Sequence, residues 1–591
     1  MSKRLSRILV AVVLIIAAVL YWCFLPPLSL FHFGTVLSLE IIGVIIFFLI
    51  RCANPDDWNI LTKALISTGK IAMIITGVDL LILIICCPLF HGGMLYSQLG
   101  NGNIDNIKKV PYQQMIEEVD TSQLPVIDEE SARVYAEAQI GGNSALGSAF
   151  KLGAGAKIDV GGIIYWIFPL EHAGFWEWKD YPSSPGYVAV NASNPSDAKI
   201  HDGYKIVYSK SSYLMWNTMR HVRLGYLFGG LTEYTYEVND DWQPMEVITT
   251  YSNKVGWFYP EATGVIINDP QTGKREKYTI NEVPEWVDIV QPESFITDQI
   301  DNYGGYVRGS VHFGKADEKQ KTEEMLTVYK GNDCYYFTGM TSKGGDKSLT
   351  GFMMVNTRTK EALEVDMDTG ITETRAMEIG ANLWSDFGYY SIEPLPINVD
   401  GVATFVVPVK SEISNTITGY SMVCAIDSSI AAKGETLRSA AKRYSRKLGS
   451  SNVGFAASDR AYNYEASGTI FRIHSEMQEV DTYYLFVLSD DMTKIYTCDS
   501  ALSDELAMTE TGDQVVITYV DDGNGTLTVK KFDNKLFELQ ISENQQKRDE
   551  ANSSANDDIE IPTVNPEENA DWWNSLTDEE RTEIMEQSSK E

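Results

Sequence analysis

Catalytic and cofactor motifs are missing from this chain of 591 residues. It contains no His-Glu-x-x-His zinc motif, no Gly-x-Ser-x-Gly nucleophile motif and no phosphate loop ending in Gly-Lys-Ser/Thr. The seven histidines show no metal-ligand spacing. The sequence therefore predicts no catalytic residue, no cofactor-binding residue and no metal ligand.

Cysteine is also scarce, with seven residues in the whole chain. Four of them lie within the first 97 residues, and the other three are Cys334, Cys424 and Cys498. An odd, sparse set does not make a disulfide scaffold. We expect buried free thiols, with a Cys334–Cys424 disulfide as the alternative.

Basic residues are few in comparison with acidic ones. Lys and Arg total 48 against 81 Asp and Glu, which gives a net charge of −33. Nucleic-acid binding depends on Lys and Arg that neutralise phosphates, so this balance argues against a nucleic-acid partner. An acidic surface is typical of soluble domains outside the bacterial membrane.

Long apolar runs occur only near the N-terminus, over about residues 8–25, 36–50 and 71–90. A helix needs about 20 apolar residues to cross a bilayer, and about 17 still suffice. The first and third runs are long enough, and the second is short unless its flanks are included. The sequence predicts an integral, multi-pass membrane anchor of three transmembrane helices over residues 1–97.

The basic residues around these runs predict the orientation. Lys3, Arg4 and Arg7 precede the first run, three more basic residues lie within 51–70, and residues 26–34 contain none. Because positive residues stay on the cytoplasmic side, we expect a cytoplasmic N-terminus and an extracytoplasmic location after about residue 91. A cleaved signal peptide is the alternative for the first run, but no small-x-small cleavage site follows it.

Two acidic residues, Glu40 and Asp79, interrupt the apolar runs. An acid within a membrane is costly and often functional. We expect protonated or hydrogen-bonded carboxyl groups that help the helices to pack. The alternative is an ion or proton pathway, which would make the protein a membrane transport subunit.

Three internal repeats follow, each a strand, a loop and a second strand that opens with glycine. The first covers 245–251 and 264–278, the second 334–340 and 351–365, and the third 404–409 and 419–427. The pattern predicts antiparallel β-meanders. Helical stretches are expected at 286–301, 373–384 and 435–448, and a further helix at 128–140. The fold class is therefore α+β.

The turn of the first repeat, Asn268-Asp-Pro-Gln-Thr-Gly-Lys274, resembles that of the PepSY family of small extracytoplasmic modules. The second repeat has Lys360 where the family has glycine. The resemblance implies a binding or regulatory role, such as the restraint of a secreted peptidase or an interaction near the cell wall.

Five further strand-like runs predict a small OB-like β-barrel, over 468–473, 482–488, 494–498, 512–519 and 526–532. Oligonucleotide-binding barrels need a basic groove with stacking aromatic residues. Acidic residues crowd the predicted loops instead, so we expect a structural or protein-binding barrel.

Two segments are candidates for partner binding. Arg438, Lys442 and Arg443 lie in a dense basic cluster on the helix predicted at 435–448, which would suit an anionic wall polymer or would simply be a solvated face. The acidic tail contains Trp572, Trp573 and Leu576 before a capping-box sequence. That short helix would bind a partner or dock on the protein's own barrel.

These features predict the following order of domains. Residues 1–97 form the membrane anchor, 98–310 and 311–450 form α+β domains, 465–540 form the barrel, and 541–591 form an acidic disordered tail. We expect a non-enzymatic binding or regulatory module of the bacterial cell envelope, with an envelope protein or an anionic wall polymer as partner, and homo-oligomers are possible. The enzymatic alternative is an envelope hydrolase whose carboxylates meet only in the fold.

Overall fold

The computed structural model describes residues 3–51, 58–117, 124–142, 144–311, 317–344, 348–384, 388–412, 416–451, 453, 464–478, 481–521 and 527–536. The chain divides into two compact units. The first consists of Met1–Asn463 with Val520–Thr528, and the second of Tyr464–Tyr519 with Val529–Glu591.

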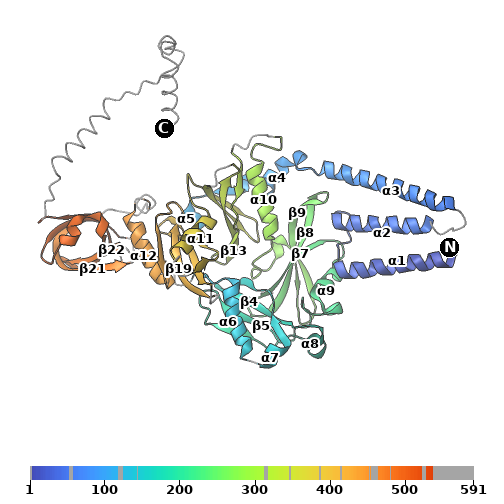
Figure 1. Ribbon diagram of the computed structural model, residues 1–591, viewed down its shortest axis with the longest axis horizontal. Helices are drawn as coiled ribbons and strands as arrows, with labels where there is room; N and C mark the ends of the chain where they lie inside the picture. Colours follow the sequence, from blue (N-terminus) through green and yellow to red (C-terminus); the bar gives the residue numbers. More distant parts are fainter. Residues whose placement is uncertain are drawn as a thin grey trace, which may run out of the picture. The chain divides into compact units, whose positions relative to one another are not determined.

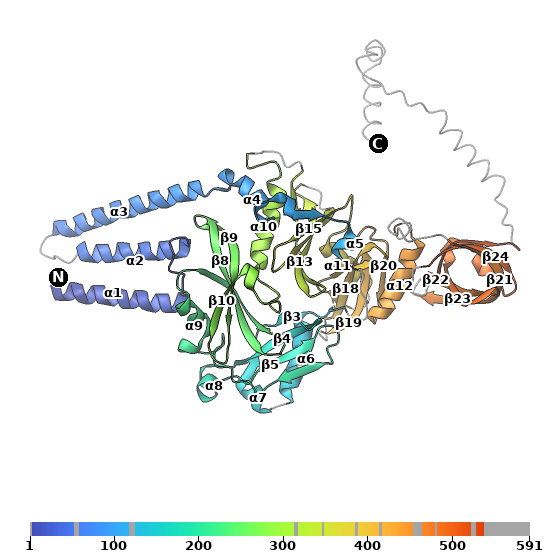
Figure 2. The same ribbon diagram turned by 180° about the vertical axis from the view of Figure 1, so that it is seen from behind.

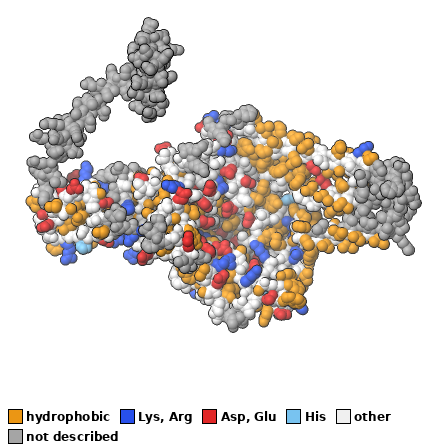
Figure 3. All heavy atoms as spheres, viewed as in Figure 1, with side chains coloured by type: hydrophobic (Ala, Val, Ile, Leu, Met, Phe, Trp, Pro, Cys, Tyr) orange, Lys and Arg blue, Asp and Glu red, His pale blue; other side chains and the backbone are white. Residues whose placement is uncertain are grey.

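Three long helices begin the first unit: α1 (Lys3–Phe24), α2 (Phe33–Arg51) and α3 (Trp58–Ile85) (Figure 1). Hydrophobic side chains cover their surface in Figure 3. In the described part of the chain, one helical segment, Ile66–Ile85, is long and apolar enough to cross a membrane. Ile15–Phe24 and Phe33–Ile45 are shorter apolar helical segments.

Short elements connect these helices to the sheets. They are η1 (Pro88–Phe90), α4 (Gly92–Gln98), η2 (Ile104–Asn106), β1 (Ile107–Lys109), α5 (Tyr112–Met115), α6 (Glu129–Gly141) and α7 (Ser144–Ala149). The helix predicted at 128–140 is thus confirmed as α6. It begins where it does because the Asp128 carboxylate accepts a hydrogen bond from the Ser131 backbone N–H (3.2 Å), which caps the first turn.

Four sheets each contain a four-stranded antiparallel meander, which is the unit that forms the blades of β-propellers. The first has β3 (Ala156–Val160), β4 (Ile163–His172), β5 (Tyr187–Asn191) and β6 (Ala198–His201), and the second β7 (Gly230–Val238), β8 (Pro244–Val255), β9 (Phe258–Asn268) and β10 (Arg275–Thr279). The third has β12 (Leu326–Lys330), β13 (Asp333–Ser342), β14 (Leu349–Asn356) and β15 (Ala362–Asp366), and the fourth β17 (Leu395–Val399), β18 (Val402–Ser411), β19 (Ile417–Cys424) and β20 (Ala431–Gly434).

The last three meanders coincide with the three predicted repeats, and the first is a further copy that the sequence analysis missed. Additional strands β2 (Phe150–Leu152), β11 (Lys319–Lys321) and β16 (Tyr389–Ser391) pair with β4, β13 and β18, and β1 pairs with β15 in parallel. The α+β class is confirmed.

The glycine predicted to open the second strand of each repeat lies within that strand, and its position has a structural reason. Gly264, Gly351 and Gly419 each lie next to a register shift in the ladder with the preceding strand. A Cβ atom at Gly264 or Gly351 would overlap the carbonyl oxygen of the neighbouring strand. Gly186 in the first meander meets the same obstacle at the His201 carbonyl. A β-bulge with close backbone approach therefore recurs in the repeats.

The turn after that strand is also shared between repeats. The Asp269 carboxylate accepts the backbone N–H groups of the residues two and three positions later, and so does the Asn356 side-chain oxygen. Gly273 has φ +72° in one turn and Lys360 has φ +65° in the other. The lysine thus adopts the left-handed conformation that glycine adopts more easily.

The helices within, between and after the meanders are α8 (Phe175–Asp180), η4 (Leu214–Trp216), α9 (Thr218–Gly225), η5 (Ile280–Glu282), α10 (Glu293–Gly305), α11 (Glu373–Asn382) and α12 (Leu437–Ser450). The last two match the predicted helices. The prediction of a helix at 286–301 was wrong at its start. Pro292 precedes the first helical residue, and a residue before proline is disfavoured in helical conformation.

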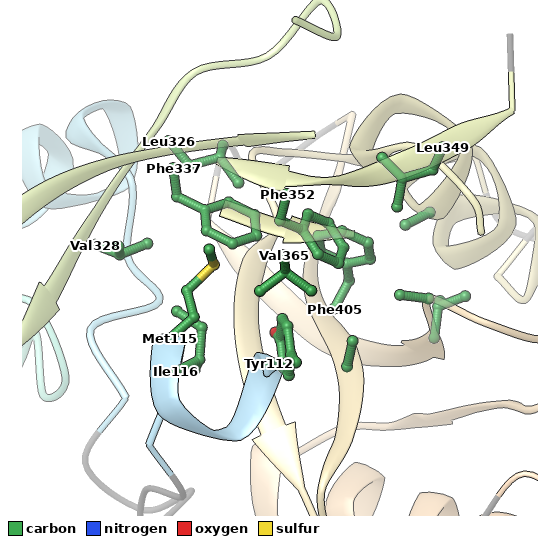
Figure 4. Close-up of a cluster of buried hydrophobic side chains, with 14 of the residues drawn as sticks. Tyr112, Met115, Ile116, Leu326, Val328, Phe337, Leu349, Phe352, Val365 and Phe405 are labelled. Atoms are coloured by element: carbon green, nitrogen blue, oxygen red, sulfur yellow. The ribbon is translucent and has the colours of Figure 1, made fainter. Parts of the chain in front are cut away.

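The third and fourth meanders share a hydrophobic core with α5 (Figure 4). Tyr112 and Met115 insert from α5 between Phe337 of β13, Phe352 of β14 and Phe405 of β18. The Tyr112 hydroxyl donates to the Ile397 carbonyl (3.0 Å). Cys334 and Cys424 are buried and free, as expected, and the alternative of a disulfide between them was wrong.

The second unit is a closed barrel of five strands, as the sequence predicts (Figure 2). The strand order is β21-β22-β23-β25-β24. Its elements are β21 (Tyr464–Gln478), β22 (Asp481–Leu488), β23 (Asp491–Asp499), η7 (Ser500–Leu502), η8 (Asp504–Met508), β24 (Gln514–Asp521) and β25 (Leu527–Asn534). The ladder from Tyr464–Tyr519 to Thr469–Gln514 joins β24 to β21 and closes the barrel.

Candidate functional site

The hairpin of β8 and β9 docks against the ends of the apolar helices. The Trp257 indole N–H donates to the Leu30 carbonyl (3.0 Å), and the Asn253 amide donates to the Phe31 carbonyl (2.8 Å). The Tyr259 hydroxyl donates to the Cys86 carbonyl at the end of α3 (3.1 Å). These bonds attach the second meander to the loop between α1 and α2 and to α3.

A cavity of about 710 Å³ lies beside this contact. Its wall consists of the α1–α2 loop with the start of α2, the end of α4, strands β7–β9 and one face of α10. Segments more than two hundred residues apart in the sequence thus meet around one space. Its size is within the range of pockets that hold small ligands.

Three side chains in this wall contain polar atoms that lack a hydrogen-bond partner in the described structure. Gln299 is 2% exposed, and both polar atoms of its side chain are unpartnered. Gln98 is 5% exposed with an unpartnered Nε2, and both ring nitrogens of His32 are unpartnered. A buried polar group without a partner costs about 1–3 kcal/mol, so native proteins seldom retain one without a role.

Aromatic rings also line the cavity. The Tyr251 ring meets Phe295 edge to face with centroids 5.4 Å apart, and the His32 ring packs against Tyr251 at 5.5 Å. Phe33 packs against Trp257 at 5.1 Å. The cavity thus combines flat apolar surfaces with a few unpartnered polar groups, as ligand sites commonly do.

The electrostatics of the cavity do not suit an anion. Its lining contains Asp298 and Asp301 and no Lys or Arg. Burial, assisted by Asp301, raises the pKa of the Asp298 carboxyl. Burial and the nearby Arg223 guanidinium lower the pKa of His32, so its imidazole is neutral at neutral pH. The lining offers hydrogen bonds and no cationic group.

The predicted site residues lie elsewhere. Glu40 of α2 and Asp79 of α3 are close enough for their carboxyl groups to interact. Arg438 and Lys442 are exposed on α12, whereas Arg443 is half-buried and donates to the Lys433 carbonyl (2.9 Å). Trp572, Trp573 and Leu576 lie outside the described residues.

The sequence analysis missed the glutamines because their neighbours in the cavity are distant in the chain. One local signal was present, since Gln299 lies among the apolar residues Phe295, Ile296 and Ile300 on the buried face of α10. A polar side chain on such a face indicates a buried bond or a ligand. Within the described ranges, no group of three or more His, Cys, Asp or Glu residues has the arrangement of a metal site.

Comparison with known proteins gives no family. No family model and no curated protein matches the sequence. Among solved structures, the chain is similar to an α-L-arabinofuranosidase from Lactobacillus brevis, with 10% identity over 68% of this chain and 99% of the other and a TM-score of 0.16. The chain is also similar to an exo-1,5-α-L-arabinanase from a bovine ruminal metagenomic library, with 9% identity over 64% of this chain and 95% of the other and a TM-score of 0.14. A third similar structure is a glycosyl hydrolase from Bacteroides ovatus, with 10% identity over 65% of this chain and 94% of the other and a TM-score of 0.17. Similarities this weak carry no argument about fold or activity.

Proposed function

We propose that this protein is a membrane-anchored, extracytoplasmic binding module of the bacterial cell envelope, without enzymatic activity. The anchor is α1–α3, whose surfaces expose apolar residues such as Ile15, Met73 and Leu80. The basic residues at 3–7 and within 51–70 support a cytoplasmic N-terminus, with the sheets and the barrel outside.

The cavity beside the β8–β9 hairpin is the recognition site in this proposal. In the proposed orientation the cavity lies at the extracytoplasmic surface of the membrane, where it would bind the headgroup of a lipid. The unpartnered Gln299 amide, buried among aromatic rings, is the observation that supports this role most strongly. Because the lining contains amides, carboxyls and rings but no Lys or Arg, we propose a neutral, hydroxyl-rich headgroup such as the sugar of a glycolipid.

The remaining modules are proposed to serve interactions. The meanders are PepSY-like in their turn pattern, and the strand order of the barrel, with β24 between β21 and β25, is OB-like. Arg438 and Lys442 on α12 are available to an anionic wall polymer or an acidic envelope protein. The Trp572 segment is a second candidate for contact with a partner.

Lipid nanodiscs test the headgroup. Full-length protein is reconstituted in phosphatidylglycerol with or without monoglucosyl diacylglycerol, and its melting temperature is measured. We expect the glycolipid to raise the melting temperature of the wild type and not that of Gln299→Met. Gln139→Met is the matched control, because Gln139 is also helical but exposed, and it should keep the shift.

Three results would contradict parts of this proposal. An equal melting temperature with and without the glycolipid would reject the neutral headgroup. Cleavage of the glycolipid by the purified protein would favour the hydrolase alternative. Loss of an ion flux in vesicles upon Asp79→Asn would favour the transport alternative. The orientation is tested separately, by labelling of a Ser196→Cys variant with an impermeant maleimide, which should succeed in intact cells.

A further inference from the structure

A second cavity, of about 340 Å³, lies where the four meanders meet. The first strand of every meander contributes to its wall: β3, β7, β12 and β17. The segment before α6 and the segment before α10 complete it. The innermost strands of β-propeller blades surround a central channel in the same way, so this cavity follows from the repeat architecture.

Two buried carboxyl groups lie in this central cavity. Glu237 of β7 is 3% exposed, and its Oε1 accepts a hydrogen bond from the Thr235 hydroxyl (2.8 Å), whereas its Oε2 has no partner in the described structure. Asp288, also 3% exposed, accepts from the Asp159 backbone N–H (2.7 Å) and from the Tyr329 hydroxyl (3.4 Å). An unpartnered carboxylate oxygen at such depth is a strong hydrogen-bond acceptor without a donor.

The carboxyl groups around the cavity are not all paired with a cation. Of its other acids, Asp128 pairs with Lys410 and Glu129 pairs with Arg133. For Glu237, Asp288 and the rim residue Glu393, no Lys or Arg nitrogen lies within 4 Å among the residues that the structure describes. The single lysine of the lining, Lys157, donates instead to the Pro125 carbonyl (3.3 Å). Lys157 is near enough to Glu393 for their charges to attract, but it forms no ion pair with Glu237 or Asp288 in the described structure.

Much of the remaining wall is apolar. Its apolar lining residues include Ile158, Trp166, Ile289, Leu326 and Leu395. A ligand that fits must therefore have a slender apolar body and a cationic end. An alkylammonium chain has this composition, since its methylene groups would contact the side walls while its ammonium donates to the carboxyl groups.

We propose that the central cavity binds a primary alkylammonium group, with its nitrogen donating to Glu237 Oε2 and to Asp288. The group has two possible sources, a free diamine or the lysine side chain of a protein partner. This site is separate from the cavity beside the β8–β9 hairpin, and the proposal does not depend on membrane anchoring or on the glycolipid.

Binding should release protons. Burial and the mutual proximity of the two acids raise the pKa of Glu237 to about 8, and burial raises that of Asp288 to about 7. At neutral pH most of the Glu237 carboxyls are protonated, and an entering ammonium favours the ionised form. The other titratable or charged groups near the pair are Asp159, Tyr329, Cys334, Arg358, Lys157 and Glu393. Burial lowers the pKa of Lys157.

Isothermal titration calorimetry on the full-length protein in nanodiscs tests the proposal. The probes are 1,5-diaminopentane, the peptide acetyl-Gly-Lys-Gly-amide and, as a neutral analogue, 1,5-pentanediol. At pH 7.5, in buffers that differ in ionisation enthalpy, we expect at least one amine to bind with release of protons, and the diol not to bind. Binding of the diamine alone would indicate a free amine as ligand, and binding of the peptide a partner's lysine.

Two variants separate the site from general effects of burial. Glu237→Gln keeps the size of the side chain. It should weaken amine binding at least tenfold and reduce the proton release to the smaller part that comes from Asp288. Glu246→Gln is the control, since Glu246 is likewise buried but is bonded to Thr218 and Asn268 and is not part of this cavity. Absence of binding by both amines, or equal affinity of the wild type and Glu237→Gln, would overturn the proposal.

Discussion

The Lys410 ammonium lies 2.6 Å from the Asp128 carboxylate, although 282 residues separate them. Lys410 belongs to β18 and its side chain is fully buried, while Asp128 caps the start of α6. The Glu130 carboxylate lies 2.9 Å from the same ammonium. The fourth meander is thereby joined to the helix that packs on the first, so one buried cation connects the two ends of the repeat array.

Replacement of this cation should destabilise the first unit. Lys410→Met removes the ammonium and leaves two carboxylates of the α6 N-terminus close together. Loss of one partner of a buried ion pair costs about 3–5 kcal/mol, and we expect about 3 kcal/mol because Asp128 and Glu130 are partly exposed. Urea unfolding measures the loss. The exposed pair Lys199–Asp197 provides the control, since Lys199→Met should change stability by less than about 0.5 kcal/mol.

Gln299→Met should stabilise the protein when no ligand is bound. The substitution keeps the length of the side chain and removes two polar atoms that lack partners, so the folded state avoids a cost of about 1–3 kcal/mol. The melting temperature in lipid without a glycolipid should therefore rise. If Gln299 instead stabilised the folded state, the Gln299→Met variant would have a lower melting temperature than the wild type. The control variant Gln139→Met alters an exposed residue, so its melting temperature should change little.

The sequence predicts the repeats of this chain but not its two cavities. The repeats were predictable because each glycine bulge and each Asn or Asp turn is encoded within about 35 neighbouring residues. The first copy was missed because its strand β4 is separated from β5 by α8. Gln98 and Gln299, or Glu237 and Asp288, become neighbours only when the meanders assemble, and no local pattern records such contacts.

Stability of the first unit should depend on pH through Glu237. Its carboxyl ionises near 4.5 in the unfolded chain and near 8 in the folded protein. Between these values the folded state holds a proton that the unfolded state has released. The stabilising contribution of Glu237 is therefore complete below about pH 4.5 and is lost as the pH rises to about 8.

Glu237→Gln removes this contribution to the pH dependence. Urea unfolding between pH 5 and 8 should show a smaller decline for the variant than for the wild type. Glu246→Gln tests a second buried carboxyl, with a pKa near 7, and should remove a smaller part of the decline. A wild-type stability that rises over this interval would contradict the assignment of Glu237 as a buried, protonated acid.

The Lys360 turn combines two opposing effects, and their balance can be measured. Its φ of +65° costs about 1–2 kcal/mol relative to glycine. Its ammonium, however, is buried and lies 2.9 Å from Glu261. Removal of one partner from a buried pair costs about 3–5 kcal/mol, and the lower end applies here because Glu261 keeps Lys254 as a partner at 3.1 Å. Since the second effect is larger, Lys360→Gly should destabilise the protein by about 2 kcal/mol, despite the glycine in the corresponding turn of the first repeat.

A double-mutant cycle separates the two effects. Glu261→Gln alone leaves the buried Lys360 ammonium unpaired and should destabilise the protein. Lys254, which lies 3.1 Å from Glu261 and shares its carboxylate in the wild type, loses the same partner. With both substitutions no buried charge is left unpaired, because the remaining ammonium, that of Lys254, is half exposed. The relaxed glycine turn is kept. The double variant should therefore be more stable than the sum of the single changes predicts, by at least about 1 kcal/mol in urea unfolding. Additive effects would mean that the ion pair contributes little and that the turn conformation alone determines the outcome.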